Sequence, residues 1–184
     1  QARLIVDHIL SLNLGFEQVN SADVFNGFGV NGGVANGSFE FEAPGEYKAF
    51  GWRYVEDGVE RVQSTDAFDG EHYVRLAEDV EIHQGTDATG DFNRGFTEQN
   101  VTYQLTAYIK SEDNNANLSV FADFEQQKLY NRQNRQTESF SPNNTWQEVT
   151  TQFTAPIGTW KTYFGFKSLS GSVDIDNVKV KVIN

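Results

Sequence analysis

Several residue types and patterns are missing from this sequence of 184 residues, and each absence narrows what the chain can do. It has no cysteine, which excludes disulfide bonds, thiol chemistry and cysteine-bound zinc, although bacterial extracellular domains often fold without disulfides. It has no methionine and begins with Gln1, so we expect a processed product or a fragment of a longer protein. No apolar run approaches the roughly 18 residues that span a membrane, so no membrane insertion is expected.

Basic residues are scarce. The chain has 14 Lys and Arg residues against 26 Asp and Glu residues, which gives a formal net charge of -12. Such a surface repels phosphate groups, so nucleic acid and anionic lipid are not expected partners, whereas cations and neutral molecules are. Segment 126–136 (QQKLYNRQNRQ) is an exception, because it carries basic residues and no acid. It is either a solvated loop, the default, or a loop that binds the anions of an acidic polysaccharide.

Catalytic signatures are also absent. The three histidines, His8, His72 and His83, lack the spacing of a zinc site, and no nucleophile elbow, P-loop or dinucleotide fingerprint occurs. A glycosidase with paired carboxylates stays open, because the separation of acidic residues in space cannot be read from a sequence. We therefore expect a binding module rather than an enzyme.

From about residue 37 onward, short segments of alternating apolar and polar residues are separated by turns rich in Gly, Asn, Asp and Ser. This pattern predicts an all-β domain with two packed antiparallel sheets or a barrel. Aromatic residues make up 14% of the chain, so we expect rings to fill much of the core. The predicted strands are 38–42, 50–55, 59–64, 71–77, 101–111, 116–124, 146–155, 159–168 and 171–182.

The first 35 residues differ from the rest. Segment 25–37 (FNGFGVNGGVANG) is rich in Gly and Asn, which is typical of a linker. A short helix is expected near 6–13 (VDHILSLN). We therefore predict a linker or N-terminal arm over residues 1–35 and a β-sandwich module over residues 36–184.

The last segment, 171–182 (GSVDIDNVKVKV), changes register in the middle. Apolar residues occupy odd positions up to Ile175 and even positions from Val178 onward. A shift by one residue reverses the face of every side chain, so a β-bulge is predicted at Asp176 and Asn177. Asp174 is expected to face solvent, and Asp176 is a candidate to meet a cation at the edge of the sheet.

Six motifs between residues 36 and 182 occur in an order that carries a resemblance: NGSFE, GW, DAFDGEHYVRL, TYQLTAYIKS, TWQEVTTQFTAP and VDIDNVKV. Together they resemble the β-jelly-roll carbohydrate-binding modules of families 4, 9, 16 and 22. The resemblance implies a two-sheet antiparallel β-sandwich of the jelly-roll, galactose-binding-like type. It also implies a monomeric, non-catalytic module that binds a polysaccharide, with neutral β-glucan or xylan favoured. We expect it to target an attached catalytic or surface module of a secreted or cell-surface bacterial protein.

The same resemblance implies a structural calcium ion. It assigns to the metal the side chains of Glu40, Asp69 and Asp176 and the carbonyl groups of Ser38 and His72. All are hard oxygen donors of the kind that calcium prefers. Without the resemblance, these acids would be read as ordinary surface residues of an acidic protein.

The polysaccharide is expected in a cleft across one sheet, on the strands near 81–96, 118–132 and 160–167. Aromatic faces cover the apolar sides of sugar rings, and polar side chains bond the hydroxyl groups. The candidate aromatic residues are Phe92, Phe124, Tyr130, Trp160 and Tyr163, and the candidate polar residues are His83, Gln84, Gln127, Arg132 and Lys167. Core positions are expected for Phe121, Trp146, Phe153 and Phe164.

Two other functions stay open. EIHQ at 81–84 and KLYNRQ at 128–133 are similar to elements of β-jelly-roll polysaccharide lyases, in which His83, Tyr130 and Arg132 would act on an acidic polysaccharide. The arginine-rich strand motif of those lyases is missing. An adhesion or structural domain without glycan affinity is the other alternative, since a fold does not determine a function.

Overall fold

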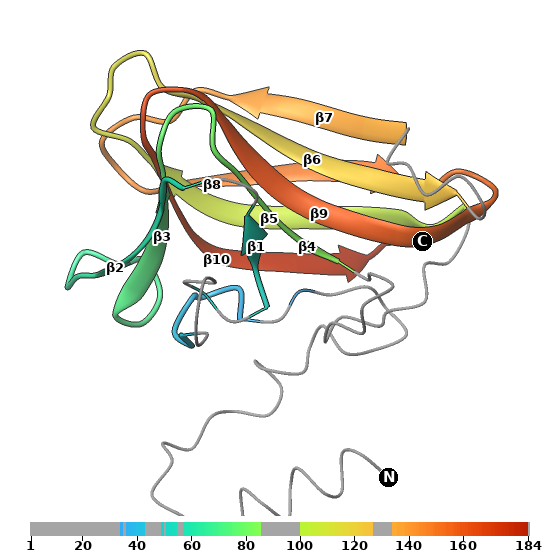
Figure 1. Ribbon diagram of the computed structural model, residues 1–184, viewed down its shortest axis with the longest axis horizontal. Coiled ribbons are helices and arrows are strands. Elements are labelled where there is room, and N and C mark those ends of the chain that lie inside the picture. The colour runs from blue at the N-terminus through green and yellow to red at the C-terminus, as the bar shows by residue number, and fades with distance from the viewer. Residues whose placement is uncertain are drawn as a thin grey trace, which may run out of the picture.

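The computed structural model of the chain describes residues 34, 36–42, 49, 51–54, 57–85, 100–126 and 134–183, which form a sandwich of two five-stranded antiparallel sheets (Figure 1). Sheet A has the strand order β1-β4-β9-β6-β7, and sheet B has the order β2-β3-β10-β5-β8. The all-β, two-sheet prediction is confirmed. The strands are β1 (Arg53–Tyr54), β2 (Val59–Gln63), β3 (His72–Leu76), β4 (Glu81–Gly85), β5 (Thr102–Lys110), β6 (Asn117–Gln126), β7 (Asn134–Phe140), β8 (Gln147–Thr154), β9 (Thr159–Ser170) and β10 (Val173–Val182).

Alternation of apolar and polar residues decides which side of each strand meets the core. On β5, Leu105, Ala107 and Ile109 are buried between the sheets, while Thr106 and Tyr108 face outward. On that outer side, the hydroxyl groups of Thr106 on β5 and Thr150 on β8 lie 3.2 Å apart across the ladder. Phe153 and Phe164 belong to the core as predicted.

The predicted bulge in β10 is confirmed. The pairing of β10 with β5 shifts register between Asp176 and Lys179, and Asn177 has a positive φ of 47°. Ile175 before the shift and Val178 after it are both buried in the core. The expected position at a sheet edge is wrong, because β10 lies in the middle of sheet B between β3 and β5.

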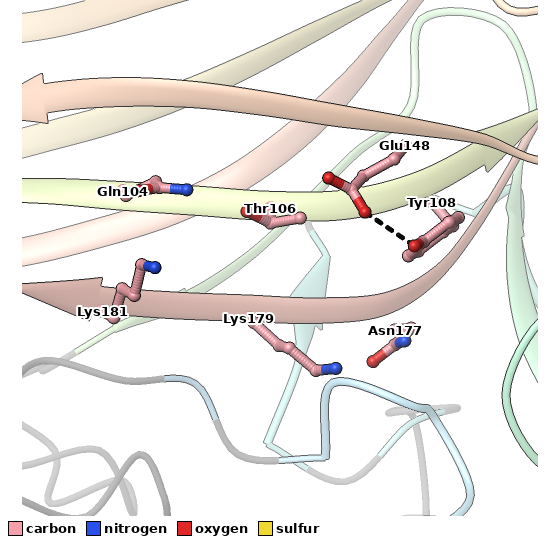
Figure 2. A pocket seen from close by; sticks show the side chains of 7 residues that line it. All are labelled: Gln104, Thr106, Tyr108, Glu148, Asn177, Lys179 and Lys181. Atoms are coloured by element: carbon pink, nitrogen blue, oxygen red, sulfur yellow. Dashed lines mark hydrogen bonds between the residues drawn. The ribbon is translucent and has the colours of Figure 1, made fainter.

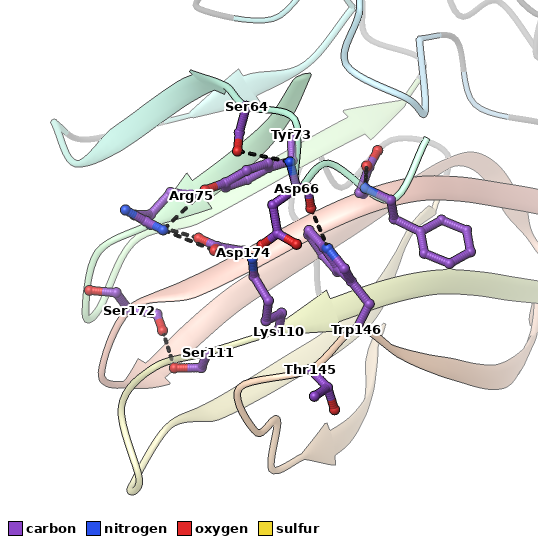
Figure 3. Close-up of polar contacts among 12 residues, drawn as sticks. Ser64, Asp66, Tyr73, Arg75, Lys110, Ser111, Thr145, Trp146, Ser172 and Asp174 are labelled. Carbon is purple, nitrogen blue, oxygen red and sulfur yellow. Dashed lines mark hydrogen bonds and ion pairs between the residues drawn. The ribbon is translucent and has the colours of Figure 1, made fainter. Parts of the chain in front are cut away.

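Asp174 does not face solvent, contrary to prediction. Its side chain is 3% exposed and accepts two hydrogen bonds from Arg75, at 2.6 Å from Nε and 2.9 Å from Nη2 (Figure 3). Lys110 Nζ lies 3.8 Å from the same carboxylate and also pairs with Asp66. The carboxylate leaves water because two cations from neighbouring strands replace its hydration.

Segment 38–42 was predicted as a strand but forms a turn whose apolar residue packs into the core. Phe39 has a positive φ of 57°, is fully buried and lies with its ring centre 5.2 Å from that of Trp52. Gly37 accepts a hydrogen bond from Val178 N, and a Cβ at Gly37 would lie only 1.9 Å from Val178 O. Val34, within the predicted linker, is also buried in the core.

Two features of the sheets were missed in the sequence. β7 was read as part of a loop, since NRQTESF has no apolar alternation, and its edge position requires none. Trp146 was expected in the core but lies on the outer side of sheet B, where its indole Nε1 donates to Asp66 O at 2.7 Å. The predicted helix near 6–13 lies outside the described residues.

Candidate ligand-binding face

The side of sheet A that points away from the core, here called the sheet A face, is the candidate ligand-binding surface. Val120, Ala122 and Phe124 on β6 belong to the core, so the residues between them point to this face. Several of its residues are buried although they lie outside the core, which strengthens their hydrogen bonds. The face comprises Glu81, His83, Ser119, Phe121, Asp123, Glu125, Arg135, Tyr163, Gly165 and Lys167.

Arg135 on the edge strand β7 links distant strands across this face. Its Nε and Nη2 donate to the Asp123 carboxylate on β6, both at 2.7 Å. Its Nη1 and Nη2 donate to Glu81 on β4 at 2.9 and 3.2 Å, so the side chain reaches over β9. The bonds to Asp123 raise the pKa of Arg135 further above its ordinary value, because they favour the charged guanidinium.

Gly165 on β9 provides the space for this link. A Cβ there would lie 2.4 Å from Ile82 O and 2.4 Å from Cζ of Phe121. The Phe121 ring occupies that space, and the Arg135 guanidinium lies 3.9 Å from the ring centre. Phe121 is fully buried, but on the sheet A face and not in the predicted core position between the sheets.

Tyr163, Glu125 and His83 form a cluster beside the Arg135 link, here called the Tyr163 cluster. The Tyr163 hydroxyl donates to Glu125 Oε2 at 3.3 Å. The His83 ring meets the Tyr163 ring edge to face, with ring centres 5.8 Å apart. Hydroxyl, carboxylate and imidazole groups are of the kinds that bond sugar hydroxyls, and these three side chains are each 4–6% exposed.

The residues that were predicted to bind calcium meet at another place, the loop before β3. Asp176 Oδ2 accepts hydrogen bonds from Phe68 N and Asp69 N, both at 2.9 Å. Glu40 Oε1 accepts bonds from Glu71 N at 2.9 Å and His72 N at 2.8 Å. Two carboxylates that lie far apart in the sequence therefore hold the two ends of one short loop.

The Asp176 carboxylate accepts three backbone hydrogen bonds, from Phe68 N, Asp69 N and Asn177 N, which engage both of its oxygen atoms. The side chain is fully buried, and loss of hydration raises its pKa to about 7, with a further rise from the nearby Asp69 carboxylate. No three acidic or histidine side chains in the described ranges lie close enough to share a metal ion. Calcium would therefore need backbone carbonyl groups, such as that of Ser38 in the turn that carries Glu40, and water as its other ligands.

Comparisons with known proteins give similarity in structure only. No family model matches the sequence, and no curated protein matches it. The enzymatically active domain of tailspike protein 4 from bacteriophage CBA120 superposes with a TM-score of 0.60 at 18% identity, over 82% of this chain and 21% of that one. The CBM22-1 xylan-binding domain from Paenibacillus barcinonensis gives 0.56 at 14% identity, over 80% and 92% of the two chains. TmCBM61 in complex with β-1,4-galactotriose gives 0.54 at 14% identity, over 80% and 96%.

The chain has the β-sandwich fold of carbohydrate-binding modules. At these low identities the likeness establishes the fold alone, and this chain spans about a fifth of the tailspike domain (21%). No helix in the described part of the chain is both long enough and apolar enough to cross a membrane.

Within this carbohydrate-binding-module fold, the predicted ligand residues separate into groups. His83 and Tyr163 lie together on the sheet A face, as does Lys167, whose Nζ is 3.5 Å from Asp79. Gln84 lies on the opposite side of β4, beside the core residue Phe164, and Phe124 is itself a core residue, so neither is available on this face. Phe92, Gln127, Tyr130, Arg132 and the side chain of Trp160 lie outside the described residues.

Four charged residues of the sheet A face, Glu81, Asp123, Glu125 and Arg135, were not predicted as ligand residues from the sequence. Asp123 and Glu125 alternate with Ala122 and Phe124, which is the pattern of acids on the outer side of a half-buried strand. That signal was present but was not used. The partnership of Arg135 with Glu81 gave no signal, because it depends on the strand order of sheet A.

Proposed function

We propose that the protein is a non-catalytic glycan-binding module whose ligand contacts the sheet A face. The observation that carries the proposal is the Tyr163 cluster, in which hydroxyl, carboxylate and imidazole groups are gathered outside the core. Burying such polar groups costs free energy, and this cluster is not part of the hydrophobic core. We therefore infer that it serves ligand binding. The likeness in fold to xylan-binding and galactotriose-binding modules supports a glycan as the ligand class.

A neutral polysaccharide, β-glucan or xylan, is the favoured ligand for this face. Glu81, Asp123 and Glu125 supply three carboxylates, and Arg135 is bonded to two of them. The face therefore has no net positive charge at its centre with which to attract uronate or sulfate groups. The net charge of -12 for the whole chain also disfavours an anionic polysaccharide at this face.

The biological effect would be targeting. Binding to a polysaccharide chain keeps an attached catalytic or surface module at a high effective concentration near its substrate. We place the module, as a monomer, in a secreted or cell-surface bacterial protein. The expected first steps are recognition of several sugar units by the sheet A face and retention of the attached module on the polymer.

We further propose that a structural calcium ion binds where Asp176 and Glu40 hold the loop before β3. The two carboxylates would supply charge, Asp69 would lie near the ion, and the carbonyl groups of Ser38 and His72 would complete the ligand set with water. Calcium would stabilise the folded state because it binds that state preferentially. It has no part in contacting the sugar.

Affinity electrophoresis tests the glycan proposal. The protein is run through gels that contain β-glucan, xylan or polygalacturonate, and the polymers are checked for cleavage. We expect retardation by a neutral polymer without cleavage. Glu125→Gln, which keeps the shape but removes the charge, should weaken that binding about fivefold, the equivalent of one hydrogen bond. The matched control Glu112→Gln makes the same charge change at an exposed position and should bind like the parent.

Three outcomes would overturn the proposal. If the Glu125→Gln variant and the parent are retarded equally, the ligand does not bind at the sheet A face. Cleavage of polygalacturonate would favour the lyase alternative. Retardation by no polymer would leave a structural or adhesion domain.

A further inference from the structure

The outer side of sheet B carries a groove that the proposed glycan site does not use. It encloses about 220 Å³ and runs over β5, β8 and β10 (Figure 2). Tyr108 stands near one end, and Gln104 and Lys181 lie together near the other. The residues that line it, here called the sheet B groove, are Gln104, Thr106, Tyr108, Glu148, Asn177, Lys179 and Lys181.

Two lysines give this groove its charge. Lys179 and Lys181 lie two residues apart on β10, so their side chains point to the same side, where they pair with Thr106 and Gln104 of β5. Both are exposed, and neither forms an ion pair with a described residue. The chain has a net charge of -12, yet these two lysines lie side by side with no ion-pair partner among the described residues.

The remaining lining suits a sugar chain. Gln104, Thr106 and Asn177 offer amide and hydroxyl groups that can both donate and accept hydrogen bonds. At the Tyr108 end, the Phe68 ring is stacked on the Tyr108 ring, with centres 3.4 Å apart and planes 13° from parallel. Phe68 is 41% exposed, which leaves apolar surface at the end of the groove against which a sugar ring could pack.

The acid in the groove does not cancel this charge. Glu148 lies at the Tyr108 end of the groove, where its carboxylate accepts a hydrogen bond of 2.7 Å from the Tyr108 hydroxyl. Glu148 pairs with Tyr108 on β5, whereas Lys181 pairs with Gln104, four residues further along that strand. Four residues of a strand span roughly 13 Å, more than a Debye length in physiological salt, so Glu148 leaves the charge of Lys181 unscreened. Lys179 pairs with Thr106, two residues from Tyr108, so Glu148 offsets part of its charge and the groove keeps a net positive charge.

We propose that the sheet B groove is a second binding site, which takes a segment of an anionic polysaccharide. The carboxylate or sulfate groups of the sugar chain would pair with Lys179 and Lys181, and its hydroxyl groups would bond Gln104, Thr106 and Asn177. We favour an anionic over a neutral glycan because the positive charges of Lys179 and Lys181 complement its carboxylate or sulfate groups. The net charge of -12 of the whole chain disfavours nucleic acid, whose charges are dense along its whole length. The module thereby offers a neutral-glycan face on sheet A and an anionic-glycan groove on sheet B.

The test compares the parent with a double variant, K179A/K181A, in gels that contain polygalacturonate, dextran sulfate or neutral β-glucan. We expect the parent to be retarded by at least one anionic polymer and the double variant to bind it about five to ten times more weakly, as the loss of two exposed ion pairs predicts. K179R/K181R should keep the affinity, because the charge is retained. Comparison of the two anionic polymers distinguishes carboxylate from sulfate as the partner group.

A matched control separates the groove from the overall charge of the protein. N114D/N144D lowers the net charge by two, as K179A/K181A does, but in exposed turns away from the groove, and it should bind like the parent. Raising the salt concentration should weaken anionic binding of the parent more than that of K179A/K181A.

The inference is overturned if no anionic polymer retards the parent, or if K179A/K181A and N114D/N144D lose affinity equally. It is also overturned if K179A/K181A changes self-association in sedimentation velocity, because the groove would then bind a second copy of the chain. The Glu125→Gln variant distinguishes the two proposed sites, because Glu125 lies on the sheet A face and not in the sheet B groove. Loss of neutral binding in that variant, with anionic binding intact, shows that each proposal stands or fails by itself.

Discussion

Replacing Arg75 by alanine should destabilise the protein more than replacing its partner Asp174. The two residues pair by two hydrogen bonds of 2.6 and 2.9 Å between β3 and β10, yet their exposures differ greatly. The side chain of Asp174 is 3% exposed, and that of Arg75 is 39% exposed. Removal of either residue breaks the same contact, but the partner left behind is in a different environment in each case.

The magnitudes follow from what each variant leaves behind. Arg75→Ala leaves a buried carboxylate with only Lys110 nearby, at 3.8 Å, and breaking a buried pair in this way costs about 3 kcal/mol. Asp174→Ala leaves a guanidinium that can turn into water, so we expect about 1 to 2 kcal/mol, because solvent screens the lost attraction. For a chain of this size, about 3 kcal/mol lowers the melting temperature by roughly 6 to 12 °C.

Urea unfolding followed by circular dichroism measures both values, with the free energy of unfolding taken from the midpoint and slope. Lys181→Ala is the control, because Lys181 is an exposed residue of the same sheet that forms no ion pair within the described ranges, and it should change stability by less than about 0.5 kcal/mol. The double variant R75A/D174A should be more stable than R75A alone, because no charge stays buried without its partner. A larger loss for D174A than for R75A would refute the reasoning from burial.

Three further predictions concern other contacts. Gly165→Ala should lower the free energy of unfolding by about 3 kcal/mol in urea, because its Cβ would lie 2.4 Å from atoms of neighbouring strands; a loss under about 1 kcal/mol would contradict this. Asp176→Ala should abolish the rise in melting temperature that calcium gives the parent. If the melting temperature of the parent changes with neither calcium nor chelator, the calcium proposal is wrong. Trp146→Phe should cost about 1 kcal/mol through loss of the bond to Asp66 O, and unchanged unfolding would show that this bond contributes nothing.

The sequence predicted those parts of the fold that depend on local alternation. β5 and β6 carry apolar residues at every second position, β8 and β9 do so with polar interruptions at Thr151, Thr162 and Ser168, and the change of parity at Asp176 was enough to predict the bulge. β7 could not be predicted in this way, because an edge strand pairs on one side only and its residues need not alternate.

Partners from distant segments explain the other differences. Asp174 was predicted to be a surface residue because Arg75, the cation that pairs with its buried carboxylate, lies 99 residues earlier in the chain. His83 and Tyr163 were both named as candidate ligand residues, and the pairing of β4 with β9 brings them together on the same face of sheet A. The link from Arg135 to Glu81 across Gly165 needed the strand order, which no local pattern contains.

The position of β10 has a consequence for the order of events in folding. This strand lies between β3 and β5, so it is the element that joins the two halves of sheet B, although it is formed by the last residues described. During synthesis, β2 with β3 and β5 with β8 can pair early, but the sheet stays divided until residues 173–182 leave the ribosome. Closing contacts over such long stretches of chain is slow, and until then the flanks of β3 and β5 stay open to other chains. Sheet B is therefore joined into one sheet only after β10 has been synthesised.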